Sequence, residues 1–128
     1  MTQIEAAKRG IITKEIEETA KNEGVDAVSL MGLIAEGKAV IPNNTNRRAR
    51  LVGIGKGMRT KVNASIGTSS DIIDVKAEIE KAIAAEKAGA DTLMELSVGG
   101  DLNNIRKEVL ASISLSVGSV PLYQAFKE

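Results

Sequence analysis

The second half of the chain alternates strand patterns with helical patterns, and this alternation constrains the fold more than any other feature of the sequence. The strand patterns cover residues 60–66, 91–97 and 117–120, and helical patterns fill the two stretches between them. Strands that alternate with helices pair in parallel through right-handed crossovers. We therefore expect an α/β fold in which residues 58–128 form a β-α-β-α-β unit.

The first strand pattern has two chemically different faces. Its apolar residues alternate with polar ones: Val62, Ala64 and Ile66 against Lys61, Asn63 and Ser65. Successive side chains of a strand point to opposite faces, so one face is expected to be buried and the other polar. A Gly/Thr/Ser turn follows at residues 67–70, and α/β proteins build ligand sites at such carboxyl ends of strands. The alternative is an edge strand whose polar face meets only water.

The helices between the strands have clear start signals. Asp71 or Asp74 is expected to cap the first helix and Asp101 the second, because an aspartate side chain accepts hydrogen bonds from the free N–H groups of a first turn. The stripe that includes Val75 predicts the core-facing side of the first helix, and Glu78 is expected to face water. Pro121 is expected to end the third strand.

The first 57 residues have a different organisation, and we expect a separate helical region there with a short strand or hairpin. Thr2, Thr13 and Asp26 are candidate N-caps of three short helices, and residues 39–41 form a short apolar strand pattern. Glycines alternate at residues 53–57, but they precede a strand and lack the spacing of a phosphate-binding loop. A turn is expected there instead.

The composition excludes several classes of partner. The formal net charge is zero, which argues against nucleic acid and anionic membranes. Arg47, Arg48 and Arg50 form a local basic cluster that we expect to be a solvated loop. No apolar run approaches the ~20 residues of a spanning helix.

The chain contains no cysteine and no histidine. It therefore offers no thiolate nucleophile, no histidine base and no thiolate ligands for zinc or an iron–sulfur cluster. We predict no catalytic residue and no metal ligand within these residues. The lack of cysteine suits a cytoplasmic protein, and the charged N-terminus does not match a signal peptide.

Three parallel strands with two open edges make a poor isolated domain. A closed barrel of such units needs eight strands and about 250 residues. We therefore expect either that these residues begin a longer fold or that they complete their sheet by association, as a homo-oligomer.

Several segments together resemble the phosphomethylpyrimidine synthase (ThiC) family of thiamine biosynthesis. The similar segments are residues 1–13, Ala-Val-Ile-Pro-Asn-Asn at 39–44, Lys-Val-Asn-Ala-Ser-Ile-Gly-Thr-Ser at 61–69, Gly-Ala-Asp-Thr-Leu-Met-Glu-Leu-Ser-Val-Gly-Gly-Asp-Leu at 89–102, and Val-Gly-Ser-Val-Pro-Leu-Tyr-Gln-Ala at 117–125. They keep the family's order and spacing over nearly the whole chain. The resemblance covers only the first part of a family member.

The resemblance implies a TIM-type (βα)₈ barrel of which this chain supplies the first three strands. It implies a radical carbon–carbon lyase that converts aminoimidazole ribonucleotide to hydroxymethylpyrimidine phosphate. It also implies three cofactors of the full-length family: a 4Fe-4S cluster, S-adenosylmethionine and a divalent metal such as zinc. The family's cysteine and histidine ligands lie beyond residue 128, so this chain alone is expected to be inactive.

The resemblance carries three substrate-binding positions into this chain, namely Ser65, Met94 and Tyr123. Met94 and Tyr123 match the family, whereas the family usually has asparagine where Ser65 stands. A hydroxyl lacks the paired donor and acceptor groups of an amide, so Ser65 offers a ligand fewer hydrogen bonds than the family's asparagine does. Without the resemblance, Met94 reads equally well as aliphatic core and Tyr123 as a surface ring.

Two other functions compete with the enzyme. The first is a non-catalytic half-barrel that self-associates through open sheet edges. The second is an independent sugar-phosphate-binding domain, in which the turns at residues 67–70 and 98–101 donate backbone amides to phosphate.

Overall fold

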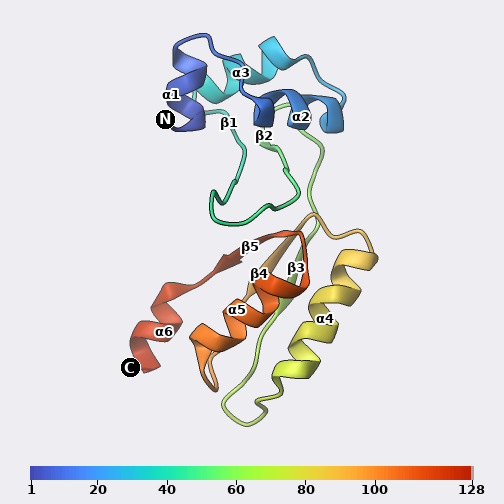
Figure 1. The fold of residues 1–128 in the computed structure, drawn as a ribbon, viewed down its shortest axis with the longest axis vertical. Helices are drawn as coiled ribbons and strands as arrows, with labels where there is room; N and C mark the ends of the chain where they lie inside the picture. Colours follow the sequence, from blue (N-terminus) through green and yellow to red (C-terminus); the bar gives the residue numbers. More distant parts are fainter. Residues whose placement is uncertain (128) are drawn as a thin grey trace. The chain divides into compact units, whose positions relative to one another are not determined.

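The computed structural model describes residues 1–127, which form two compact units (Figure 1). Unit 1 is Met1–Thr60 and unit 2 is Lys61–Glu128. Each unit has its own buried core and is described by itself. None of the helices among the described residues is long and apolar enough to cross a membrane.

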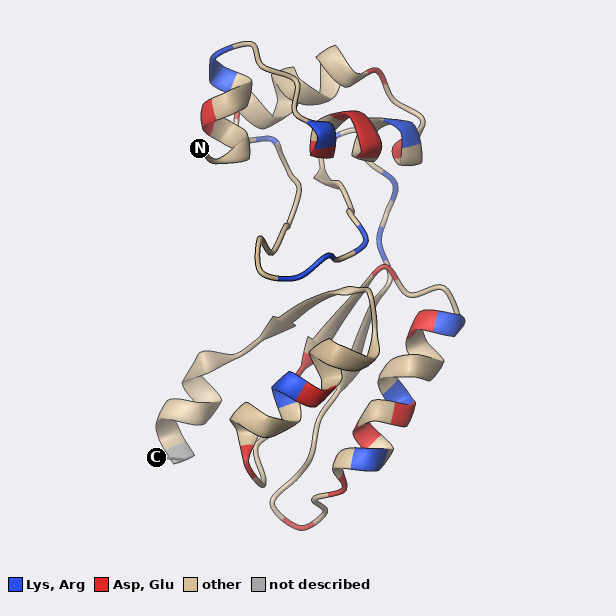
Figure 2. Cartoon of the chain, in the orientation of Figure 1, with Lys and Arg blue, Asp and Glu red and all other residues tan. Residues whose placement is uncertain are grey.

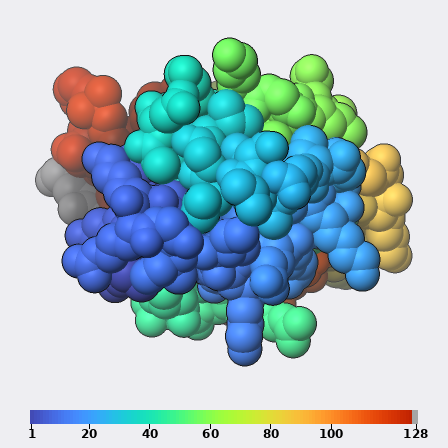
Figure 3. Space-filling model, turned by 90° about the horizontal axis from the view of Figure 1, so that it is seen from above, coloured from blue at the N-terminus to red at the C-terminus, as the bar shows by residue number. Residues whose placement is uncertain are grey.

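Unit 1 consists of three short helices and a small antiparallel ribbon. Its elements are α1 (Gln3–Lys8), α2 (Lys14–Glu23), α3 (Ala27–Ala35), β1 (Ala39–Val40) and β2 (Ile54–Gly55). Helix α3 contacts both α1 and α2, and the space-filling view shows the surface that these helices form (Figure 3). Their shared core contains Ala7, Ile16, Ala20, Leu30, Ile34, Ala39 and Ile41.

The predicted N-caps of unit 1 are confirmed. Thr2 forms a capping box with Glu5: the Thr2 N–H donates to Glu5 Oε2 at 2.7 Å, and the Glu5 N–H donates to Thr2 Oγ1 at 3.3 Å. Thr13 and Asp26 accept the N–H groups of Ile16 and Ser29 in the same way. These bonds satisfy donors that a helix start otherwise leaves unpaired.

The glycine-rich segment of unit 1 forms β2 and a turn. Gly55 has φ +135°, and a Cβ there would lie 2.3 Å from the carbonyl oxygen of Lys38. The close approach of β2 to β1 therefore explains why glycine occupies position 55.

Unit 2 is the predicted β-α-β-α-β unit followed by one further helix. Its elements are β3 (Asn63–Ile66), α4 (Val75–Lys87), β4 (Thr92–Glu95), α5 (Leu102–Ser112), β5 (Ser116–Ser119) and α6 (Pro121–Lys127). The strands form a parallel sheet in the order β3-β4-β5. The α/β class and the parallel sheet are thus confirmed.

Helices α4 and α5 pack on one face of this sheet and enclose the core of unit 2 (Figure 1). The core contains Ile66, Ala82, Ala90, Leu93, Leu102, Ile105, Val109, Ile113 and Leu115. Asp74 caps α4 by accepting the Ala77 N–H at 3.0 Å, and Asp101 caps α5. Basic and acidic residues are mixed along α4 (Figure 2).

Two expectations about buried side chains are wrong. Val62 is 61% exposed, because it precedes the strand ladder, which begins only at Asn63. Its N–H donates to the buried carboxylate of Asp91 at 2.7 Å. Glu78 is buried rather than exposed. Its carboxylate accepts the Gly67 N–H at 2.7 Å and pairs with Lys81 at 2.5 Å, so its charge is compensated inside the fold.

Candidate functional site

One face of the parallel sheet carries the candidate site, and we call it the open face. Its residues form two rows across the three strands: Asn63, Thr92 and Ser116, then Ser65, Met94 and Gly118. Partners in the register share a face, and the intervening residues Ala64, Leu93 and Val117 belong to or pack against the core of unit 2. The open face therefore points away from α4 and α5.

The open face is mostly polar and accessible. Asn63 and Ser65 are exposed, while Thr92 and Met94 are half-buried. In the first row, the Thr92 hydroxyl donates to Asn63 Oδ1 at 2.8 Å. In the second row, Met94 is the single large apolar side chain. The face can thus offer both hydrogen bonds and one apolar contact to a ligand.

Two of the three sequence-predicted site residues are neighbours in the sheet, and the third lies on a helix. Ser65 and Met94 are direct partners in the register of β3 and β4. Tyr123 lies on α6 instead, where its side chain is 43% exposed and its N–H donates to the Val120 carbonyl at 3.0 Å. Ser65 and Met94 therefore form one surface, and Tyr123 follows the third strand of the same sheet on a separate element.

The loops at the carboxyl ends of β3 and β4 lock together, which the sequence did not indicate. Thr68 is buried; its hydroxyl donates to the Gly99 carbonyl at 2.7 Å, and its N–H donates to Ser97 Oγ at 3.0 Å. A Cβ on Gly99 would lie 2.0 Å from the Ser69 carbonyl oxygen. The carboxyl edge of the sheet beside the open face is therefore tightly packed.

This packing removes the amide donors of the proposed sugar-phosphate site. The N–H groups of Gly67, Thr68 and Ser69 donate to Glu78, Ser97 and Ile72 respectively. The Val98 N–H donates to the Thr68 carbonyl at 3.1 Å. Because these four donors already have partners, they are not available to bind a phosphate.

A buried carboxylate, Glu95, lies on the opposite, helix-facing side of β4. Its Oε1 accepts the Ser97 N–H at 2.8 Å, and its Oε2 lies 3.6 Å from Nε of Arg106. Only 2% of Glu95 is exposed. Glu95 therefore braces the β4 loop and α5 from inside the core and does not reach the open face.

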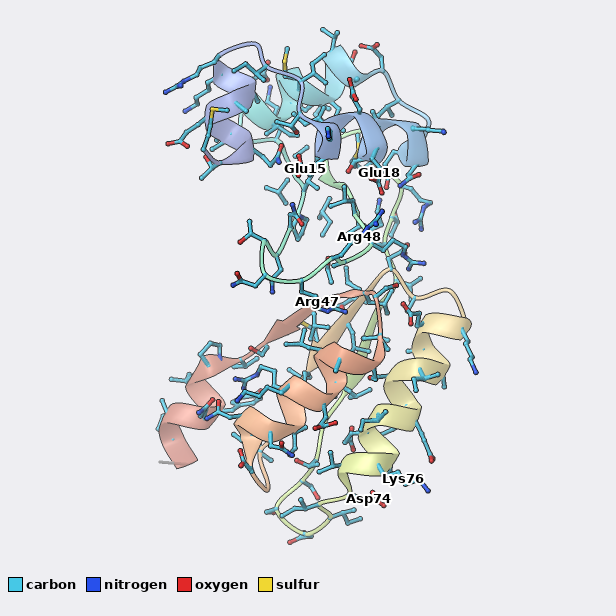
Figure 4. The ribbon with its side chains drawn as sticks, in the orientation of Figure 1. Glu15, Glu18, Arg47, Arg48, Asp74 and Lys76 are labelled. Atoms are coloured by element: carbon cyan, nitrogen blue, oxygen red, sulfur yellow. The ribbon has the colours of Figure 1, made fainter. Side chains whose placement is uncertain are left out.

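The grooves of unit 1 contain none of the predicted site residues. One, of about 480 Å³, is lined by apolar side chains that include Ile4, Ile34 and Val40. The other, of about 400 Å³, lies between α2 and the loop that joins β1 to β2, where Glu15 and Glu18 line it together with Arg47 and Arg48 (Figure 4). The sequence indicated neither groove, because each is formed by side chains distant in the chain.

The second groove is electrostatically mixed. Hydrogen bonds from the Glu15 backbone and from Gln3 lower the pKa of Glu15, so its carboxylate stays ionised at neutral pH. Gln3 Nε2 donates to Glu15 Oε2 at 3.1 Å, and Asn43 Nδ2 lies 3.5 Å from Oε1. Two carboxylates beside Arg47 and Arg48 leave no single charge to select a ligand.

Comparison with known proteins identifies the family. The sequence profile of the radical SAM ThiC family matches residues 2–128. The chain belongs to the radical SAM ThiC family. The resemblance seen in the sequence is therefore confirmed.

The ThiC relatives of this chain carry two different names. The chain is 62% identical over 128 residues to phosphomethylpyrimidine synthase 2 of Methanosarcina acetivorans and covers 30% of that protein. It is 61% identical over 127 residues to 5-hydroxybenzimidazole synthase of Geobacter metallireducens and covers 29% of it. The chain thus spans less than a third of the length of the curated relatives it matches.

Membership of a radical SAM family implies S-adenosylmethionine and an iron–sulfur cluster. These residues do not fit a cluster, because the chain has no cysteine to supply thiolates. Within the described part of the chain, no group of three His, Cys, Asp or Glu side chains could hold a metal ion. The residues of this chain therefore cannot supply the thiolate ligands of the cluster.

Proposed function

We propose that these residues are the N-terminal part of an enzyme that converts aminoimidazole ribonucleotide to hydroxymethylpyrimidine phosphate in thiamine biosynthesis. The observation that carries the proposal is the family match along residues 2–128, together with 62% identity to a relative named phosphomethylpyrimidine synthase. Activity requires the rest of the polypeptide, and the 128 residues alone turn over nothing.

In this proposal, unit 2 supplies the first three strands of a (βα)₈ barrel. The support is geometric: both strand pairs of unit 2 are parallel, and α4 and α5 lie on one face of the sheet. A barrel places its helices outside and its other sheet face inside, with the active site at the carboxyl ends of the strands. The open face would then line the barrel interior.

The proposed role of this chain is to bind and orient the substrate. Ser65 donates and accepts one hydrogen bond, Met94 offers an apolar contact to the flat ring, and the Tyr123 hydroxyl binds a polar group. The 4Fe-4S cluster, S-adenosylmethionine and a divalent metal such as zinc are expected to bind outside these residues. Carbon–carbon lyase chemistry is likewise assigned to the complete enzyme.

A second candidate product is 5-hydroxybenzimidazole. It is favoured by the 61% identity to a relative of that name, close to the identity with the phosphomethylpyrimidine synthases. Ser65 also departs from the asparagine usual in the pyrimidine-forming family, so the substrate pocket differs at one position. Both candidate products are planar nitrogen heterocycles, so either one requires a site that binds a flat ring.

A chimaeric enzyme tests the proposal. Residues 1–128 of this chain replace the matching 128 residues of the Methanosarcina acetivorans relative, and the reconstituted protein is incubated with aminoimidazole ribonucleotide. We expect the mass of hydroxymethylpyrimidine phosphate among the products. Formation of 5-hydroxybenzimidazole would support the second candidate. Neither product, from a folded chimaera that carries its cluster, would refute both.

A self-associating half-barrel remains the alternative role. It rests on β3 and β5, which are the edge strands of the sheet in the described residues. Unpaired backbone groups on an edge strand pair readily with another chain. A homo-oligomer is proposed for the same reason.

A further inference from the structure

Gly118 occupies a strand position that does not require glycine for its backbone. It lies inside β5 and is not among the glycines with positive φ. Glycine weakens a strand interior, because it adds conformational entropy to the unfolded chain and offers no side chain to pack. A glycine there indicates that space above the backbone is needed.

The space above Gly118 is occupied by Met94. A Cβ built on Gly118 would lie 2.6 Å from Met94 Sδ and 3.4 Å from Met94 Cε, and no other atom outside Gly118 and its two chain neighbours lies within 4 Å of it. Gly118 and Met94 are partners in the register of β5 and β4. The thioether therefore lies across the backbone of the neighbouring strand.

The result is a flat apolar patch, which we call the Met94–Gly118 platform. Its neighbours on the open face are polar: Ser65 on one side and the Thr92–Ser116 pair of the first row. A thioether makes favourable contacts with aromatic rings. A ligand that binds here would thus have a flat ring to cover the platform and polar substituents to meet its rim.

We infer that Gly118 is a positioning residue, which holds the Met94 thioether flat over β5 so that it can receive the face of a planar nitrogen heterocycle. The inference rests on the proposed function for the identity of the substrate. It goes beyond that function because it assigns a role to a residue without a side chain. The inference holds for both candidate products, because each is a planar nitrogen heterocycle.

The test uses the chimaeric enzyme with methyl-¹³C-labelled methionine, in which loss of a signal in Met94→Ala assigns the Met94 methyl resonance. Addition of benzimidazole, a ring probe that needs no turnover, is expected to shift this resonance. Gly118→Ala is expected to shift it without any probe and to raise the KM for aminoimidazole ribonucleotide about tenfold, with a smaller effect on kcat, because ground-state binding is lost. Ser119→Ala, on the same strand but the opposite face, should change neither the shift nor KM.

A double variant separates positioning from mere packing. Gly118→Ala combined with Met94→Ala removes the clash, so its melting temperature should return to that of Met94→Ala alone while KM stays raised. Recovery of the normal KM in the double variant would overturn the inference. So would an unmoved Met94 resonance in Gly118→Ala or with benzimidazole. An inactive chimaera whose Met94 methyl still responds to benzimidazole would refute the proposed function and leave the platform standing.

Discussion

Thr68 connects two loops through one buried hydroxyl. That hydroxyl donates to the Gly99 carbonyl at 2.7 Å and lies 3.4 Å from the Gly99 N–H, which donates to it. Because the side chain is only 4% exposed, water cannot replace either bond. The position of the carboxyl edge of the sheet thus depends on a residue that touches no predicted ligand.

Thr68→Val is expected to destabilise unit 2 by about 1–3 kcal/mol, because the isosteric change leaves buried backbone groups of Gly99 without a partner. Urea unfolding followed by circular dichroism measures the change. Thr60→Val, at an exposed position, serves as the control and should change stability by less than about 0.5 kcal/mol. Equal stabilities of the two variants would contradict the proposed linkage between the loops.

Gly99 and Gly32 differ in the room that each leaves for a side chain, so the two positions can be compared by the same substitution. Gly99→Ala would place its Cβ 2.0 Å from the Ser69 carbonyl oxygen, whereas a Cβ on Gly32 in α3 meets nothing within 4 Å. We expect Gly99→Ala to cost at least about 2 kcal/mol, since backbone must move. Gly32→Ala should stabilise its helix by up to about 1 kcal/mol. Thermal unfolding of both variants tests this, and a well-tolerated Gly99→Ala would disprove the close packing.

At the scale of elements, local signals in the sequence located most helices. The N-caps Thr2, Thr13, Asp26 and Asp101 were predicted and confirmed, because capping depends on residues three apart. Of the two candidates for α4, Asp74 is the cap.

β3 and β4 were predicted too long and β5 was predicted one residue too late, since a residue pattern does not show where a ladder begins and ends. The burial of Glu78 was missed because its partner is the Gly67 N–H on another element. The pairing of Ser65 with Met94 follows from parallel register. The contact of Met94 with Gly118 depends on a side-chain conformation that no sequence pattern reveals.

The caps of α1 and α3 predict how unit 1 responds to acid. Hydrogen bonds from the Thr2 backbone and hydroxyl lower the pKa of Glu5, and a hydrogen bond from the Ser29 backbone lowers the pKa of Asp26. A carboxyl whose pKa is lower in the folded than in the unfolded state stabilises the fold. This contribution is complete above the pKa of the unfolded state, near 4, and is lost as the pH falls through the pKa of the folded state.

The free energy of unfolding of unit 1 should therefore fall as the pH is lowered from about 4.5 to about 3. Asp26→Asn keeps a good N-cap without the titrating charge, so its stability should depend less on pH in this window. Urea unfolding at several pH values measures the difference. Identical pH profiles of wild type and Asp26→Asn would show that the cap charge contributes nothing.

At the scale of the whole molecule, the chain is about 30% of its relatives' length, and the parallel sheet has three strands among the residues that the structure describes. We predict that a polypeptide of residues 1–128 self-associates as its concentration rises, because β3 and β5 present unpaired edges. In the chimaeric enzyme, further strands can pair with those edges, so self-association through β3 and β5 should not occur as its concentration rises. Sedimentation velocity over a hundredfold concentration range decides this, and a folded monomer throughout would contradict it.

The most direct test of the open face as a substrate surface is calorimetric titration of aminoimidazole ribonucleotide into the chimaeric enzyme and its Met94→Ala variant. We predict that Met94→Ala raises Kd about tenfold, since a tenfold change corresponds to about 1.4 kcal/mol and the lost thioether contact is of that order. Ser119→Ala, on the helix-facing side, should bind as the parent does. Equal affinities of the parent and Met94→Ala would show that the substrate does not bind to the open face.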